Sequence, residues 1–153
     1  AGVAPGAAYR HFDSQAQLLL AVVTQLFEQL EAALSRSATR GPEPLNTIRA
    51  LSHAYVEWGL ANPGRYQLLF ETADQEQALA IGERPGLQLI DEVALLLEMH
   101  NNSNSSASDT AIRIWTYLHG LVSLRTHKTG MTWPHDVKTE IDQFLDSFIG
   151  RPS

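Results

Sequence analysis

Residues 14–34, SQAQLLLAVVTQLFEQLEAAL, decide the fold class of this chain. Apolar side chains recur here at intervals of three and four residues, which places them on one face of an α-helix. The members of this stripe are Leu19, Val22, Val23, Leu26, Phe27, Leu30 and Leu34. Ser14 and Gln17 have the spacing of a capping box, in which the hydroxyl caps a backbone N–H and the amide reaches back. We therefore expect a long amphipathic helix over about 14–36, with any extension ended by Arg40-Gly41-Pro42.

The rest of the chain repeats the helical pattern and gives almost no strand signal. No stretch alternates cleanly between apolar and polar residues, and no Asn-Gly or Asp-Gly hairpin turn occurs. Further helices are expected at about 44–61, around Tyr66–Phe70, and at 87–99, 108–128 and 134–149, with loops at 73–86 and 101–106. The predicted fold class is all-α, a helical bundle.

Composition indicates one folded domain without a membrane segment. The chain has 153 residues, of which 44% are hydrophobic and 18% charged, a composition typical of a globular protein. It contains no cysteine, which removes disulfides and thiolate metal sites and fits a reducing compartment. The apolar run Leu18–Val23 is too short to cross a bilayer, and we expect no signal peptide. We expect a cytoplasmic protein.

Catalytic and metal-binding patterns are absent from the sequence. The six histidines show no His-Glu-x-x-His arrangement, and no Gly-x-Ser-x-Gly elbow or phosphate-binding glycine loop occurs. We therefore expect neither an enzyme nor a metal or cofactor site. The formal net charge of −6 also argues against a large nucleic-acid surface within these residues.

The first twelve residues, AGVAPGAAYRHF, combine a glycine turn, a proline at the start of a short helix and a Tyr-x-His-Phe ending. Followed by the capped helix at Ser14, this order resembles the TetR/AcrR family of one-component bacterial repressors. The resemblance implies that residues 1–13 are the C-terminal part of a helix-turn-helix domain and that residues 14–153 form an effector-binding and dimerisation domain. The family's first helix and most of its second would lie upstream of Ala1, so DNA binding is expected to need them.

The same resemblance implies a set of DNA-contacting residues, namely Ala4, Pro5, Gly6, Ala7, Tyr9, His11 and Gln15. Ala7 would offer a methyl contact to thymine, whereas Tyr9 and His11 would hold phosphates. Gln15 stands where the family usually has a lysine, and the loss of one phosphate contact would lower the salt dependence by about one unit of slope. The expected nucleic-acid partner is a double-stranded, palindromic operator.

Two later stretches, YVEWGLANPGRYQLLF at 55–70 and WTYLHGLV at 115–122, resemble signatures of one TetR C-terminal class. The resemblance implies a bundle that binds a small organic effector and forms a homodimer through its last two long helices. The implied effector pocket comprises Tyr55, Trp58, Tyr66, Phe70, Val93, Leu96, Trp115 and His119. The implied dimer interface comprises Leu118, Leu121, Val122, Arg125, Ile141, Phe144, Leu145 and Phe148.

Residue chemistry leaves two interpretations of the aromatic positions open. Aromatic rings with polar tips are the usual lining of an organic-ligand pocket, but aromatics at helical spacing more often belong to a core. His119 is expected to be a core histidine with a hydrogen-bond partner. Gly120 costs its helix about 1 kcal/mol relative to alanine, which favours a close helix crossing at this position.

The function expected from these observations is a transcriptional regulator, in the form of a repressor released from its operator by a small organic effector. The alternative is a helical, small-molecule-binding dimer with no role on DNA. The acidic net charge favours this alternative, as do the departures from the family pattern at Ala4, Ala8 and Gln15.

Overall fold

The computed structural model describes residues 14–37, 43–70, 87–100 and 106–150. Within these ranges the ordered elements are all helices: α2 (Gln15–Ser37), α3 (Pro44–Ala61), α4 (Pro63–Phe70), α6 (Leu87–His100), α7 (Ala107–His127) and α8 (Val137–Phe148). The expected all-α fold is confirmed. The predictions for 1–13, 73–86 and most of 101–106 fall on residues outside these ranges.

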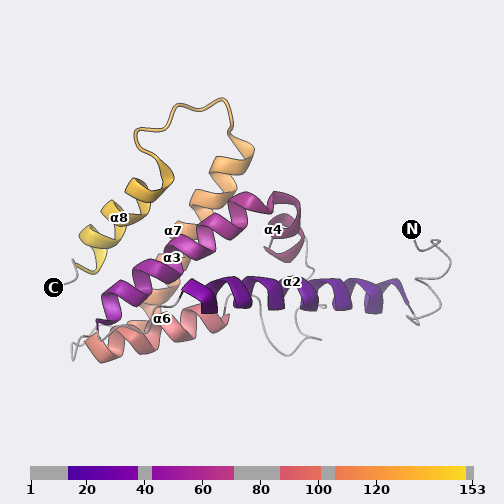
Figure 1. Cartoon of the computed structure of the whole chain (residues 1–153), viewed down its shortest axis with the longest axis horizontal. Helices are drawn as coiled ribbons and strands as arrows, with labels where there is room; N and C mark the ends of the chain where they lie inside the picture. The colour runs from indigo at the N-terminus through magenta and orange to yellow at the C-terminus, as the bar shows by residue number, and fades with distance from the viewer. Residues whose placement is uncertain (1–13, 38–42, 71–86, 101–105, 151–153) are drawn as a thin grey trace.

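Helix α3 is the centre of the bundle, and α2, α4, α6, α7 and α8 all pack against it (Figure 1). Its side chains Ile48, Leu51, Tyr55 and Val56 are 0% exposed. Helices α6 and α7 also pack extensively on each other. Helix α2 extends away from the bundle at its N-terminal end, and the chain reaches the N-terminus there (Figure 1).

Local capping explains where several helices begin. The Gln17 backbone N–H donates to Ser14 Oγ over 3.2 Å, which confirms the hydroxyl half of the predicted cap at the start of α2. Helix α8 begins at Val137 and not at Pro134, because Asp136 is its cap: Oδ1 of Asp136 accepts from the Thr139 backbone N–H at 3.0 Å.

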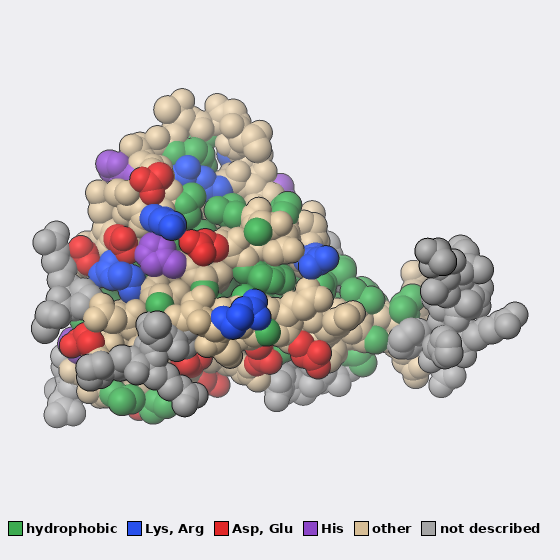
Figure 2. Space-filling model, viewed as in Figure 1, with side chains coloured by type: hydrophobic (Ala, Val, Ile, Leu, Met, Phe, Trp, Pro, Cys, Tyr) green, Lys and Arg blue, Asp and Glu red, His purple; other side chains and the backbone are tan. Residues whose placement is uncertain are grey.

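Helix α2 has the length and mean hydropathy, 1.3, of a candidate membrane span, which the short apolar run in the sequence did not suggest. Its buried residues lie on one side, at Val23, Leu26, Phe27, Leu30 and Leu34, and the helix packs on α3 and α4. The other two members of the predicted stripe, Leu19 and Val22, are partly buried and pack against the core, so the stripe is confirmed. This one-sided burial is the pattern of a core helix, and apolar side chains remain visible along the projecting N-terminal half (Figure 2).

The close helix crossing predicted at Gly120 is wrong, and it occurs at Gly59 instead. A Cβ built on Gly120 would meet no atom within 4 Å, so this position is open. A Cβ on Gly59 would lie 2.8 Å from Val122 Cγ1 and 2.9 Å from Tyr66 Cδ2. Gly59 therefore lets α7 and α4 approach α3, a close approach that only the missing side chain allows.

A cluster of charged side chains joins α8 to α3. Arg49 donates to Asp142 at 2.6 Å and to Asp146 at 2.5 Å, and His53 Nε2 lies 2.8 Å from Asp142. Burial raises the pKa of Asp142, but the hydrogen bonds from Arg49 and His53 outweigh it, so the pKa of this carboxyl lies below its ordinary value. Figure 2 shows acidic, basic and histidine side chains gathered over this part of the molecule.

Candidate functional site

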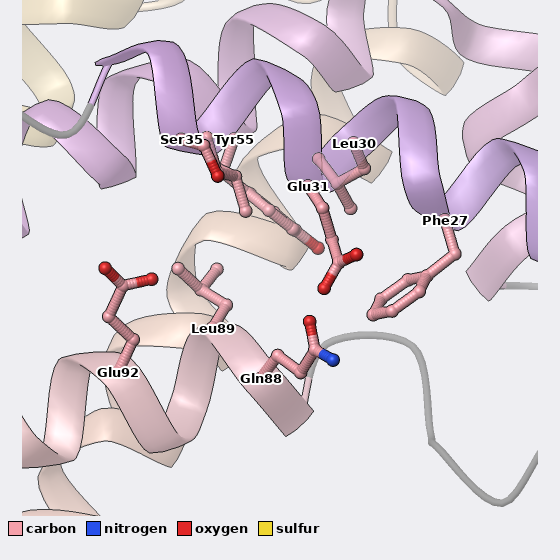
Figure 3. A pocket seen from close by; sticks show the side chains of 9 residues that line it. Phe27, Leu30, Glu31, Ser35, Tyr55, Gln88, Leu89 and Glu92 are labelled. Atoms are coloured by element: carbon pink, nitrogen blue, oxygen red, sulfur yellow. The ribbon is translucent and has the colours of Figure 1, made fainter.

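A cavity of about 170 Å³ lies between α2, α3 and α6 (Figure 3). Helix α2 forms one side of it and α6 the opposite side, and the Tyr55 side chain of α3 extends into the space between the two helices. Its lining consists of Phe27, Leu30, Glu31, Leu34, Ser35, Tyr55, Gln88, Leu89 and Glu92. Helix α2 packs on α3 and α4 but makes little direct contact with α6, so the cavity occupies the place of a helix–helix interface.

The lining divides into an apolar part and a polar part. Phe27, Leu30, Leu34 and Leu89 are each at most 8% exposed and provide the apolar part. In Figure 3 the Glu31 carboxylate of α2 and the Gln88 and Glu92 side chains of α6 point across the gap toward the facing helix. Among the nine lining residues none is lysine, arginine or histidine, so the charge contributed by the lining is negative.

Tyr55 connects this cavity to a chain of hydrogen bonds that ends at α7. The Trp115 indole N–H donates to the Tyr55 hydroxyl at 3.1 Å, and this hydroxyl lies 2.8 Å from the hydroxyl of Tyr66. The Tyr66 hydroxyl in turn lies 2.6 Å from His119 Nδ1. His119 is thus half-buried with a partner, in line with its interpretation as a core histidine.

The indole fixes the first direction along this chain, because it donates and never accepts. In the Tyr55–Tyr66 bond either hydroxyl can donate, and the direction of the Tyr66–His119 bond depends on the tautomer of the imidazole. Burial raises the pKa of Tyr55 well above its ordinary value, and the bonds to Tyr66 and Trp115 offset this only in part. The Tyr55 proton therefore stays in place to donate.

Ring contacts make the same residues a tightly packed cluster. The ring centroids of Tyr66 and Phe70 are 4.7 Å apart, those of Phe70 and Trp115 are 6.3 Å apart, and those of Trp115 and His119 are 5.6 Å apart. We call these four residues together with Tyr55 the aromatic cluster. Such tilted and edge-on pairs stabilise a fold beyond the area they bury.

The structure therefore brings five of the eight predicted effector residues together, and Tyr55 alone among the eight lines the cavity. Val93 and Trp115 border a narrower gap between α3, α6 and α7 that has no room for a water molecule. Trp58 and Leu96 are half-buried and pack against the core.

Most lining residues of the cavity were missing from the predicted pocket. Phe27, Leu30, Leu34 and Leu89 were recognised only as apolar helix positions, because a stripe that faces a cavity has the same spacing as one that faces a core. The polar members Ser35, Gln88 and Glu92 carried no signal by themselves. The carboxylate beside the stripe, one turn after Phe27, was the available clue.

The predicted dimer residues fall into two groups. Leu118, Val122, Ile141 and Leu145 are at most 1% exposed and Leu121 is 8% exposed, all within the core of the single chain. Phe144 stacks on Tyr117 with centroids 3.8 Å apart, and the 37% exposed Phe148 stacks on Phe144 at 5.2 Å. Arg125 lies over the Trp133 ring at 4.3 Å and donates to the His135 carbonyl at 2.7 Å.

The predicted DNA-contacting residues are almost all outside the described part of the chain. Ala4, Pro5, Gly6, Ala7, Tyr9 and His11 precede residue 14. Gln15 is the first residue of α2 and is exposed. It therefore stands at the projecting, N-terminal end of α2 (Figure 1).

Comparisons with known proteins identify the fold through solved structures and the family through a family model. Two solved structures share the fold: "Structure of a protein with unknown function from Rhodococcus sp. RHA1" (TM-score 0.75, 24% identity, 96% of this chain and 77% of that one), and "Crystal structure of putative regulatory protein SCO4313" (TM-score 0.66, 21% identity, 98% and 81%). No curated protein matches. The family model described as "Tetracyclin repressor-like, C-terminal domain" matches residues 48–148. The chain therefore belongs to the TetR family of regulators and carries its C-terminal domain.

Proposed function

We propose that this chain is the sensing part of a one-component transcriptional regulator, a repressor that a small organic effector releases from operator DNA. The observation that carries the proposal is the cavity of about 170 Å³ with α2 as one wall. Five of its nine lining residues belong to α2: Phe27, Leu30, Glu31, Leu34 and Ser35. Any molecule that fills the cavity therefore bears directly on this helix.

The projecting helix supplies the mechanical link from the cavity to DNA. Residues 1–13 belong, in this proposal, to the DNA-reading head, and residues 14–153 sense the effector and dimerise. An effector between α2 and α6 favours a position of α2 that differs from the empty one, and the head at its N-terminal end moves with it. Two heads must match major grooves about 34 Å apart, so a small rotation of each α2 lowers operator affinity. Effector and operator then weaken each other's binding reciprocally.

We propose that the homodimer forms through the outer faces of α7 and α8. Tyr117, Phe144 and Phe148 make a continuous stack across these helices, and Leu124 on α7 is 47% exposed. Exposed apolar and aromatic surface of this kind is typical of subunit interfaces. The buried members of the predicted interface, such as Leu118 and Ile141, support this face from within. The proposed compartment is the cytoplasm, where the operator is.

Sedimentation tests the dimer directly. Phe148→Glu and Leu124→Glu are expected to shift the chain from dimer to monomer, because each places a charge in the apolar contact. The control is Met99→Glu, since Met99 is 68% exposed on α6 and lies off the proposed face. A dimer that survives both α7 and α8 variants would contradict the assignment of this face.

Operator titration tests the regulatory role. Binding to a palindromic site, weakened when the cavity is filled, is the expected result. An effector that binds the cavity while the protein ignores DNA at every salt concentration would favour the second candidate, a small-molecule-binding dimer. The formal net charge of −6 is the observation that keeps this candidate in view.

A further inference from the structure

We propose that the cavity between α2, α3 and α6 binds a compact alcohol or phenol of about one ring, and that the Tyr55 hydroxyl recognises the hydroxyl of this ligand. The inference rests on the proposed function only in taking the cavity as the effector site. It is carried by the size of the cavity, by its buried apolar lining and by a hydrogen-bonding position of Tyr55 that the described residues leave unused.

The size of the cavity limits the ligand to a compact molecule. A dry engineered cavity of about 150 Å³ accommodates benzene, whereas drug-sized ligands occupy pockets of roughly 300–1,000 Å³. With about 170 Å³, this cavity suits a single ring with a short side chain. Phe27, Leu30, Leu34 and Leu89 are buried and offer that ring an apolar surface.

The polar groups of the described lining differ in what they can offer a ligand. Glu31 and Gln88 each already interact with another residue. Ser35 and Glu92 are exposed, so a bond from either to a ligand replaces a bond to water and gains little. Tyr55 is 0% exposed, and its side chain extends into the space between α2 and α6 (Figure 3). Tyr55 is therefore the buried polar group that a ligand within this space meets.

The Tyr55 hydroxyl has one hydrogen-bonding position left. A tyrosine hydroxyl has one proton to donate and two lone pairs that accept. One lone pair accepts from the Trp115 indole N–H at 3.1 Å, and a second bond joins this hydroxyl to that of Tyr66 at 2.8 Å. Tyr55 makes no other hydrogen bond to the described residues. If Tyr55 donates to Tyr66, a lone pair of Tyr55 remains; if Tyr66 donates, the Tyr55 proton remains.

This unused position selects a hydroxyl group on the ligand. A hydroxyl both donates and accepts, so it fits Tyr55 in either direction of the Tyr55–Tyr66 bond. An ether or a carbonyl only accepts and an ammonium group only donates, so each of these fits one direction alone. Burial raises the pKa of Tyr55, so the contact joins two neutral hydroxyls. A buried position that gains a partner contributes more to affinity than an exposed one that exchanges water for the ligand.

Two probes of nearly equal shape test this contact: 2-phenylethanol, and propylbenzene, in which a methyl group replaces the hydroxyl. Calorimetry gives the affinity of each probe for the parent chain and for the Tyr55→Phe variant. We expect Tyr55→Phe to weaken 2-phenylethanol about fivefold, the loss of about one hydrogen bond, and to leave propylbenzene within about twofold. Because each probe is compared with itself in two proteins, the different costs of removing the probes from water cancel.

A second hydroxyl of the lining provides the matched control. Ser35→Ala also removes one hydroxyl from the cavity, but at an exposed position on α2. It should leave the affinities for both probes within about twofold, because water had already satisfied that hydroxyl. Retained binding of propylbenzene shows that Tyr55→Phe is folded with its cavity in place.

The indole N–H resonance of Trp115 tests the same contact in the parent chain, so this test does not depend on the folding of Tyr55→Phe. Trp115 donates to the Tyr55 hydroxyl, and a new bond to that hydroxyl should shift the indole signal more with saturating 2-phenylethanol than with saturating propylbenzene. Trp133 lies under Arg125, past the end of α7, so its signal should stay in place with both probes. Trp115→Phe assigns the Trp115 signal.

The outcomes separate this inference from the function on which it rests. An unchanged affinity of Tyr55→Phe for 2-phenylethanol, an equal loss in Ser35→Ala, or equal shifts of the Trp115 signal with both probes overturn the hydroxyl assignment and leave the cavity as an effector site. Binding of neither probe, or a shift at Trp133 alone, overturns the cavity itself. If 2-phenylethanol binds with the expected dependence on Tyr55 but does not change operator affinity, the ligand class is supported and the repressor mechanism is contradicted.

Discussion

The two sides of α3 differ in how completely they are filled. On the side of α4 and α7, the aromatic cluster packs ring against ring and its hydroxyls form a continuous chain of hydrogen bonds. On the side of α2 and α6, apolar and acidic side chains surround a space that none of the described residues fills. Tyr55 belongs to both sides. Close packing on the first side stabilises the fold. The unfilled space on the second side forgoes the stability that closer packing would give, and it is the site that we propose for a ligand.

The largest expected effect compares two leucine truncations. Leu51 is 0% exposed in the centre of α3, and Leu51→Ala should lower the free energy of unfolding by an amount near the top of the range of about 2–5 kcal/mol. Leu30 is 2% exposed but borders the cavity, so Leu30→Ala removes fewer contacts and should fall near the bottom of that range. Urea denaturation measures both. Equal losses of unfolding free energy in the two variants would mean that the cavity lining is packed as tightly as the centre of α3.

The next effect concerns the shared hydroxyl. Tyr55→Phe leaves the Trp115 N–H without its acceptor in a partly buried place, at a cost of about 1–3 kcal/mol. The control is Tyr117→Phe, whose hydroxyl makes only long contacts of 3.4 and 3.5 Å to Glu140 and should change stability by less than about 0.5 kcal/mol. If Tyr55→Phe were as stable as Tyr117→Phe, the hydrogen bonds of Tyr55 would not contribute to the stability of the fold.

Alanine substitutions at two glycines should have smaller effects on stability, of opposite sign. Gly59→Ala forces a methyl group against Val122 and Tyr66, and overpacking of about 1–3 kcal/mol should exceed the roughly 1 kcal/mol that alanine gains in a helix. Gly120→Ala meets no atom and should stabilise by up to about 1 kcal/mol. Thermal unfolding reports both signs. Stabilisation by both substitutions would disprove the close crossing at Gly59.

The smallest effect is at the charged cluster on α8 and depends on pH. The pKa of Asp142 is lower folded than unfolded, so its contribution is present above the unfolded value of about 3.9 and disappears as the pH falls through the folded value. Its side chain is 44% exposed, and Asp142→Asn should cost less than about 1 kcal/mol at pH 7. The difference from the parent chain should close below pH 4; a difference that persists there would assign the loss to packing.

Most of the fold could be predicted from the sequence. The all-α fold and the helix ranges follow from apolar spacing, because α2 and α3 bury the stripes that their sequences display. The end of α8 nearest Pro134 was misjudged, since both Pro134 and Asp136 are compatible with a helix start and only the cap bond at Thr139 decides between them. Gly120 and Gly59 look alike in sequence, and only the packing of α7 against α3 distinguishes them.

The candidate site was predicted less well than the fold, for a physical reason. The large aromatic side chains of the cluster can be recognised in the sequence, and in the structure their rings are in contact. The cavity is a space between α2 and α6 that side chains do not occupy. The residue types at Leu30 and Leu89 are the same whether a leucine borders a cavity or a filled core, so the sequence does not predict the cavity. The distribution of charge around that space, at Glu31 and Glu92, appears only when the two helices face each other (Figure 3).

The central claim, that filling the cavity moves α2, is tested most directly by a distance measured within one chain. The sequence has no cysteine, so Ala16→Cys on exposed α2 and Lys128→Cys at the exposed end of α7 accept spin labels without side reactions. Labelled chains diluted with unlabelled ones give the intramolecular distance by pulsed electron resonance. Saturating 2-phenylethanol, a single-ring molecule whose size suits a cavity of about 170 Å³, should shift this distance. A distance distribution that stays the same while calorimetry shows the cavity filled would contradict the account.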